Sequence, residues 1–294
     1  MLSAEWIALS LVPRVGGKTF KNLLTHFDQD LTAILRATTT QLRQVSGIGE
    51  KTAAEIAAIN LAQIHASIPT WQAAGIQILT WDNPQYPAAL KQIDDAPPTL
   101  FALGNLQLLD HQNLVALVGS RQPSYLARQT TLKLAESLVS DGYGLVSGMA
   151  MGIDTAAHQG FFCHFEDESL NLVPNIAVLG SGVLNCYPYQ SQSLYRMLKT
   201  QGLILSETHP TATASAARLV ARNRLITALC KALVIIETQI DGGAMHAYRF
   251  ATYQQREIYV MDLPASGNQE IIKNGINPLA LDLHNYPFHR SILE

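Results

Sequence analysis

Six short apolar runs, separated by amphipathic segments, fill the chain from residue 113 onward. The run ALVII at 232–236 has no polar position, which is typical of a strand buried on both faces of a mainly parallel sheet. Alternation of such runs with helical patterns predicts an α/β fold, an extended Rossmann-like doubly wound sheet. The expected strands are 114–119, 143–147, 175–180, 203–207, 232–237 and 257–262, and the expected helices are 124–140, 152–162, 190–200, 222–230 and 243–255.

The N-terminal part of the chain reads as short helices punctuated by two glycine turns, at 12–18 and 45–51. This is the layout of a helix-hairpin-helix pair, in which glycine lets backbone N–H groups at a helix start face a phosphate. A helical bundle that uses glycine only for tight turns is the alternative, and it is slightly favoured over DNA contact. We therefore expect a small all-α helix-hairpin-helix or SAM-like domain over residues 1–70.

Proline-rich turns mark the segment 71–112, which we interpret as an ordered connector that adds one strand, at 99–102, before the main domain. The Rossmann-like domain then covers 113–294. We expect its tail, 277–294, to pack as a strand or loop.

Composition limits the function classes. With 48% hydrophobic and 15% charged residues among 294, the chain is an ordered globular protein. Its three cysteines, Cys163, Cys186 and Cys230, are odd in number and lack metal-site spacing, so we expect neither a disulfide framework nor a zinc site. We find no signal-peptide pattern and no apolar run of membrane-spanning length, and therefore expect a cytoplasmic protein without a membrane partner. A net charge of −3 means that any nucleic-acid role depends on a local patch.

Such a patch is present between residues 208 and 236, a window without Asp or Glu that holds Arg218, Arg222, Arg224 and Lys231. Arg222, Asn223 and Arg224 open a predicted helix. Guanidinium groups near a helix start suit phosphate better than lysines do. We expect Arg222 and Asn223 to reach a crevice and Arg224 to point sideways. The alternative is a salt-bridging pair that docks the helix on the sheet.

Small residues follow several predicted strands, where ligands bind in open α/β sheets. They would let a phosphate approach the backbone, and the serine hydroxyls would donate hydrogen bonds. The strand ends also lack the dinucleotide fingerprint, so we expect no cofactor. The predicted nucleic-acid-binding residues are Gly119, Ser120, Arg121, Ser147, Gly148, Gly180, Gly182, Arg222, Asn223 and Arg224.

Further polar residues are expected to shape this site without catalysing a reaction. Asp154 and His158 lie four apart on one helix face, as an acid/base pair or, as we favour, as a helix-dipole residue with a local hydrogen bond. The Gly242–Gly243 turn is an anion site or a cap formed by Asp241. Lys231 completes this set.

The ordered motifs together resemble the DNA-processing protein A family, DprA, also called Smf. The match covers nearly the whole chain and is carried by the turns at 12–18 and 45–51, the 82–98 connector, 118–121, 147–158, 176–188, 205–207, 222–224, 236–237 and the Gly275 region.

This resemblance implies a cytoplasmic, non-catalytic protein of natural transformation. It would bind and protect incoming single-stranded DNA, form a homodimer, and load RecA, with SSB as a further partner. It assigns DNA contacts to Arg121 and to 222–224. The chain departs from the family at Pro174, where a lysine is usual, and at Leu219, where an aromatic is usual. A nucleotide-binding protein and a phosphoribohydrolase-like enzyme remain alternatives, although Tyr248 replaces the glutamate that the enzyme needs.

Overall fold

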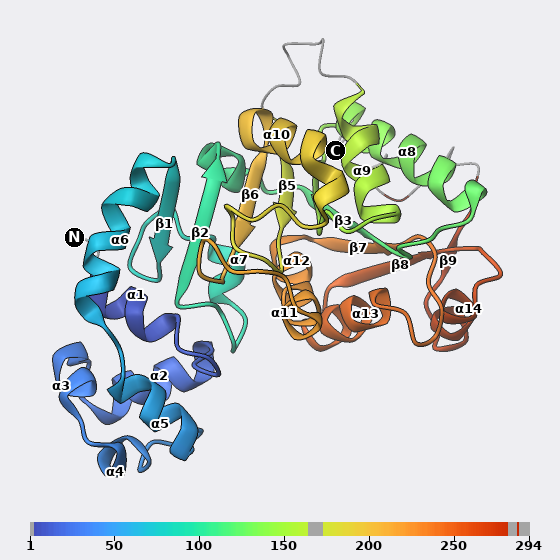
Figure 1. Cartoon of the computed structure of the whole chain (residues 1–294). Coiled ribbons are helices and arrows are strands. Elements are labelled where there is room, and N and C mark those ends of the chain that lie inside the picture. Colours follow the sequence, from blue (N-terminus) through green and yellow to red (C-terminus); the bar gives the residue numbers. More distant parts are fainter. Residues whose placement is uncertain (1–2, 164–172, 282–286, 288–294) are drawn as a thin grey trace.

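A computed structural model of the chain describes residues 3–163, 173–281 and 287. Figure 1 shows a single sheet that runs from the N-terminal helices to the C-terminal elements, with helices above and below it. Its nine strands have the order β1-β2-β6-β5-β4-β3-β7-β8-β9. The strands are β1 (Ile76–Thr80), β2 (Thr99–Gly104), β3 (Leu114–Val118), β4 (Gly144–Ser147), β5 (Asn175–Val178), β6 (Leu203–Ser206), β7 (Ala232–Ile235), β8 (Glu257–Met261) and β9 (Pro278–Leu279).

The predicted fold class is confirmed. Strands β3 to β9 pair in parallel, while β1 and β2 extend the sheet beyond β6 by antiparallel pairing. The expected single strand at 99–102 is thus accompanied by a second, β1. The tail contributes β9, and the rest of the expected tail element beyond Leu281, apart from Pro287, lies outside the described residues.

Helices cover both faces of the parallel part of the sheet. Alternate strand residues, such as Val115 and Ala116, enter two separate cores, one against α8 and α9 and the other against α12 and α13. The α-helices after β2 are α8 (Tyr125–Ser140), α9 (Ile153–Phe162), α10 (Gln192–Gln201), α11 (Ala216–Ala221), α12 (Asn223–Leu229), α13 (Ala244–Tyr253) and α14 (Ser266–Lys273). None of the described helices combines the length and apolarity needed to span a membrane.

The strand order reverses beside β3. From β3 the chain moves outward through β4, β5 and β6, and then returns to place β7 on the other side of β3. In open α/β sheets the carboxyl ends of the strands that flank such a reversal form the ligand crevice. The fold therefore places a potential binding site at the ends of β3 and β7.

The N-terminal helices pack against the 80–98 segment through an aromatic cluster of Trp6, Phe20 and Trp81. Trp6 Nε1 donates a hydrogen bond to the Pro98 carbonyl at 2.8 Å. At the first glycine turn, a Cβ on Gly17 would lie only 2.2 Å from the Ala96 carbonyl oxygen, so this glycine serves close packing. These helices are α1 (Ala4–Ser10), α2 (Gly17–His26), α3 (Leu31–Arg36), α4 (Thr39–Leu42), α5 (Glu50–Ala57) and α6 (Leu61–Ala73), followed by α7 (Ala88–Lys91).

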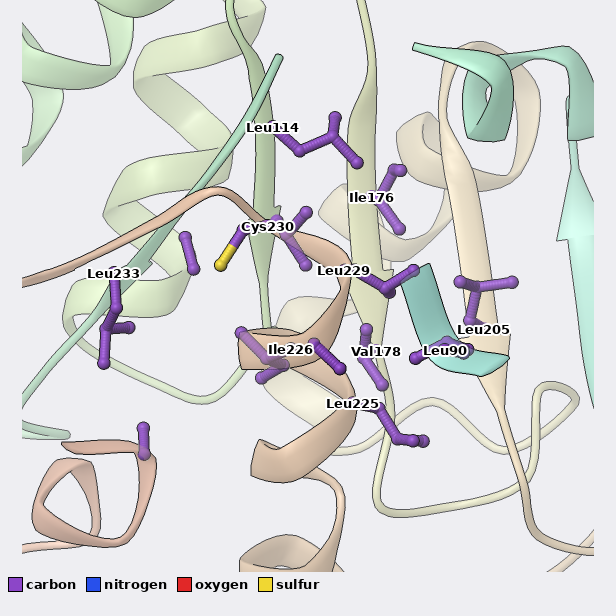
Figure 2. Close-up of a cluster of buried hydrophobic side chains, with 14 of the residues drawn as sticks. Leu90, Leu114, Ile176, Val178, Leu205, Leu225, Ile226, Leu229, Cys230 and Leu233 are labelled. Atoms are coloured by element: carbon purple, nitrogen blue, oxygen red, sulfur yellow. The ribbon is translucent and has the colours of Figure 1, made fainter. Parts of the chain in front are cut away.

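Helix α12 is buried along its whole length. Figure 2 shows its apolar side chains against strand residues and against α7; those labelled include Leu225, Ile226, Leu229, Ile176, Val178, Leu205 and Leu90. Because the helix lies deep in the molecule, the polar residues that open it are also drawn inward.

Candidate nucleic-acid interface

A cavity of about 540 Å³ opens at the carboxyl ends of β3 and β7. Ser120 and Arg121 line it from the loop after β3, and Thr238 lines it from the loop after β7. Arg222 and Asn223 reach it from the start of α12. The structure thus brings Arg121 and Arg222 to one crevice, although 100 residues separate them in the chain.

Arg121 is the exposed cation of this crevice. Backbone bonds hold its loop in place: Ser120 N–H donates to the Glu237 carbonyl at 2.7 Å, and Ile153 N–H donates to the Ser120 carbonyl at 3.1 Å. The Glu237 carboxylate accepts the Ser124 N–H at 2.7 Å. The Arg121 guanidinium has no ion-pair partner among residues 3–163, 173–281 and 287, so it is available to an anion from solvent.

Arg222 is also in the crevice but is only 5% exposed. Its Nη1 donates to the Val178 carbonyl at 2.7 Å, and its Nη2 lies 3.3 Å from Asp154 Oδ2. Burial lowers the pKa of Arg222 and raises that of Asp154, while their mutual attraction opposes both shifts. The guanidinium is therefore neutralised within the protein before any ligand arrives.

Arg224 does not face the crevice. Its Nε lies 2.8 Å from Asp95 Oδ2, and its Nη2 lies 2.6 Å from Glu207 Oε2. Burial alone would lower the pKa of Arg224, but Glu207 and Asp95 together raise it. Arg224 thus forms the salt bridges expected if it docks the helix on the sheet, and its acidic partners lie outside the acid-free window 208–236. Because its guanidinium N–H groups are used in these bonds, Arg224 has no free pair of donors for a phosphate. Its sideways direction is as expected.

A side chain at any of the four strand-end glycines would collide with an internal neighbour; Gly119 lines the cavity, and the role of these glycines in admitting a phosphate stays a prediction. A Cβ on Gly148 would lie 1.5 Å from Arg222 Nη1, and one on Gly119 would lie 2.6 Å from Ile153 Cγ1. Likewise, a Cβ on Gly180 would lie 2.9 Å from Leu219 Cδ2, and one on Gly182 would lie 2.1 Å from the His209 carbonyl oxygen. These glycines let the protein pack against itself.

Ser147 is equally internal, since its Oγ donates to the Leu117 carbonyl at 2.6 Å. At the Gly242–Gly243 turn, a Cβ on Gly242 would meet Thr238 Oγ1 at 2.4 Å, whereas Gly243 has open space. Gly243 itself is the N-cap of α13, and no side chain caps it, so the expected cap by Asp241 is not formed there.

The expected local bond between Asp154 and His158 is not formed. Asp154 pairs with Arg222, while His158 Nδ1 lies 2.5 Å from Asn175 Oδ1 at the start of β5. Lys231 Nζ donates to Asn113 Oδ1 at 2.6 Å, just before β3 begins. His158 and Lys231 therefore lie at the amino ends of the strands, and of these three residues only Asp154 lines the crevice, together with Gly242 and Gly243.

Several crevice residues were missed by the sequence interpretation, among them Gln122 and Gln239, which follow the same strand ends as Arg121 and Thr238. The carboxylate partners Asp95 and Glu207 were missed as well. The loops were identifiable from the strand pattern, but no sequence signal pointed to these particular side chains.

Comparison with known proteins assigns the chain to a family. A family model described as DNA recombination-mediator protein A matches residues 77–284, well over half of the chain. The chain belongs to the DNA recombination-mediator protein A family. A second model, the SAM-like helix-hairpin-helix tandem, matches residues 7–58 and confirms the expected N-terminal domain type.

Individual relatives agree with this assignment and confirm the resemblance found in the sequence. Protein Smf of Synechocystis is 33% identical over 286 aligned positions, which cover 92% of this chain and 69% of that protein. DNA processing protein DprA of Streptococcus pneumoniae is 32% identical over 195 positions, which cover 65% of this chain and 66% of that protein.

Two solved structures are similar. DNA processing protein A of Streptococcus pneumoniae has a TM-score of 0.77 at 24% identity, with 95% of each chain covered, and supports the fold. DNA processing protein A of Helicobacter pylori has a TM-score of 0.62 at 26% identity, covering 74% of this chain and 94% of that one. The Helicobacter structure was described for the single-stranded DNA binding mode of that protein.

Proposed function

We propose that this protein binds single-stranded DNA without chemical turnover, and that a phosphate of the strand pairs with Arg121 in the crevice at the ends of β3 and β7. Family membership and the single-stranded DNA binding of the Helicobacter pylori relative support this proposal. The observation that carries it is the exposed Arg121 guanidinium at the strand-order reversal.

The proposal implies that electrostatic attraction contributes only modestly to DNA affinity. Arg222 and Arg224 are paired with carboxylates, and Asp241 also lines the crevice. Each phosphate that is neutralised on a single strand contributes a slope of about −0.7 to the dependence of log K on log salt. We therefore expect a shallow salt dependence, in keeping with a protein of net charge −3.

Substitution of Arg121 tests the contact. We expect Arg121→Ala to weaken binding of a labelled oligo-dT roughly tenfold and to reduce the salt slope by about 0.7. Fluorescence anisotropy at two salt concentrations measures both quantities. Lys199→Ala is the control, because Lys199 is an exposed cation in the last turn of α10, away from the crevice. Equal affinities for the wild type and Arg121→Ala would refute the proposal.

A finer proposal follows from the family. The protein would act in the cytoplasm as a homodimer during natural transformation, protect the incoming strand, and load RecA onto DNA coated by SSB. Recombinase strand exchange on SSB-coated DNA, with and without the protein, tests this role. Stimulation by the wild type that is weaker with Arg121→Ala at the same protein concentration is the expected result, and no stimulation by the wild type argues against loading.

The crevice volume supports a second candidate, binding of a nucleotide, since small-molecule pockets occupy about 300–1,000 Å³. A thermal-shift comparison of mononucleotides with oligonucleotides separates the two. Stabilisation by a mononucleotide alone would favour this candidate. The phosphoribohydrolase reaction gains no support, because Tyr248 packs half-buried against the core where a glutamate would be required.

A further inference from the structure

Exposed large hydrophobic side chains gather at the carboxyl edge of the sheet. Seven of the nine found among the described residues lie in loops or first helical turns that follow β3, β4, β5 or β7. They are Tyr125, Leu126, Met151, Leu184, Tyr187, Tyr189 and Ile240. A soluble protein rarely concentrates exposed apolar groups at one edge unless they meet a ligand or partner.

Tyr125 is the most exposed of these, at 81%, and it belongs to the same loop-to-helix segment as Arg121. It is the first residue of α8, directly after the N-cap Ser124, whose side chain accepts the Ala127 N–H. Ser124 N–H is in turn held by the Glu237 carboxylate at 2.7 Å. The backbone that carries the ring is therefore anchored on both sides, while the ring itself extends into solvent.

Two exposed apolar side chains accompany it. Leu126, the next residue after Tyr125, is 49% exposed, and Met151, just before the N-cap of α9, is 43% exposed and lines the crevice. The backbone at Gly152, next to Met151, packs closely against the Arg121 loop, because a Cβ on Gly152 would lie 2.7 Å from the Arg121 carbonyl carbon. Arg121 and Met151 thus line one crevice, and Tyr125 and Leu126 begin the helix that follows the Arg121 loop.

We infer that Tyr125, together with the exposed Leu126 and Met151, is the platform on which the unpaired bases of the bound DNA stack, while Arg121 binds its phosphate backbone. The inference rests on the proposed function and adds what the site recognises beyond phosphate. Leu219, the other candidate near the crevice, is aliphatic and packs over Gly180. Stacking on an aromatic ring is tolerant of sequence and needs bases that are free of a duplex.

The test compares two probes with the same phosphates. One is oligo-dT, and the other is an oligomer of equal length that carries abasic residues. We expect the wild type to bind oligo-dT about 5- to 150-fold more tightly than the abasic oligomer. Tyr125→Ala is expected to lower oligo-dT affinity to near the abasic level without changing the salt slope, whereas Tyr125→Phe should retain the preference.

Tyr253→Ala is the matched control, because Tyr253 is 73% exposed but ends α13 at the opposite edge of the sheet. Thermal unfolding of each variant checks that it is folded. Equal wild-type affinity for the two probes, or an unchanged Tyr125→Ala, would overturn the inference and leave the Arg121 contact intact. Absence of wild-type binding to both probes would instead remove the proposed function itself.

Discussion

Arg121 and the Arg222–Arg224 pair have the same chemistry and the same role predicted from sequence, yet the fold places them in opposite environments. Arg121 sits in a surface loop with its charge open to solvent. Arg222 and Arg224 open a helix that is buried along its length, and each meets a carboxylate. A free guanidinium recognises an outside anion, whereas a buried and paired one holds the protein together.

The comparison teaches that a cationic stretch of sequence is not a cationic surface. Burying an unpaired guanidinium is very costly, so the depth of α12 requires acids near its start. Those acids come from Asp95, Asp154 and Glu207, all outside the window. Loss of DNA binding by an Arg222 variant therefore does not identify a DNA contact unless the variant is shown to fold.

The largest expected effect is on stability. Arg222→Met leaves Asp154 buried without its partner, and we expect the free energy of unfolding to fall by about 3–5 kcal/mol. Urea denaturation measures the change. Arg121→Met is the comparison variant and should change the same quantity by less than about 0.5 kcal/mol.

Adding Asp154→Asn to Arg222→Met removes the stranded charge, so we expect the double variant to recover part of the lost stability. An Arg222→Met protein as stable as Arg121→Met would show that the buried pair does not distinguish the two arginines.

His158 extends the comparison, because it is a buried base without a carboxylate partner. Burial, aided by the positive charge of Arg222 and opposed by the hydrogen bond to Asn175, lowers the pKa of His158 to about 4. Above its unfolded pKa of about 6.5 neither state binds a proton. As the pH falls from about 6.5 to 4, only the unfolded state is protonated, so stability is lost over this window by about 3 kcal/mol.

Denaturation of the wild type and His158→Gln at several pH values isolates this contribution. The difference in unfolding free energy between them should shift by that amount across the window. Parallel pH profiles for the two proteins would rule out the assigned contribution.

A substitution at Gly148 tests the Arg222–Asp154 pair, because the Gly148 backbone packs against the Arg222 guanidinium. An alanine there would place its Cβ 1.5 Å from Arg222 Nη1, and the guanidinium would have to leave Val178 and Asp154. We expect Gly148→Ala to cost about 2 kcal/mol of unfolding free energy. Gly243→Ala is the matched control, since Gly243 has helical φ and ψ and open space at its Cβ position. Similar stability of the two alanine variants would contradict this account.

The sheet could be predicted from sequence because each strand and helix has a pattern within its own short segment of the chain. The buried strands and their helices follow from apolar runs and helical periodicity, and parallel strands bring the loops after β3 and β7 to one edge by geometry alone. Ion pairing is not local: Arg224 meets Asp95 across 129 residues. Strand β1 was missed because a five-residue edge strand beside proline-rich turns has no strong pattern.

The smallest expected effect concerns Lys231, the cation that shares the acid-free window with Arg222 but lies at the amino ends of the strands, bonded to Asn113. If the DNA binds at the carboxyl edge of the sheet, Lys231→Ala should leave oligo-dT affinity and its salt slope unchanged, while Arg121→Ala lowers both. Anisotropy titrations of the two variants at matched salt distinguish DNA binding at the carboxyl edge from diffuse electrostatic attraction. Diffuse attraction depends on total charge, and both substitutions remove one positive charge, so equal losses from the two variants would mean that the carboxyl edge has no special role.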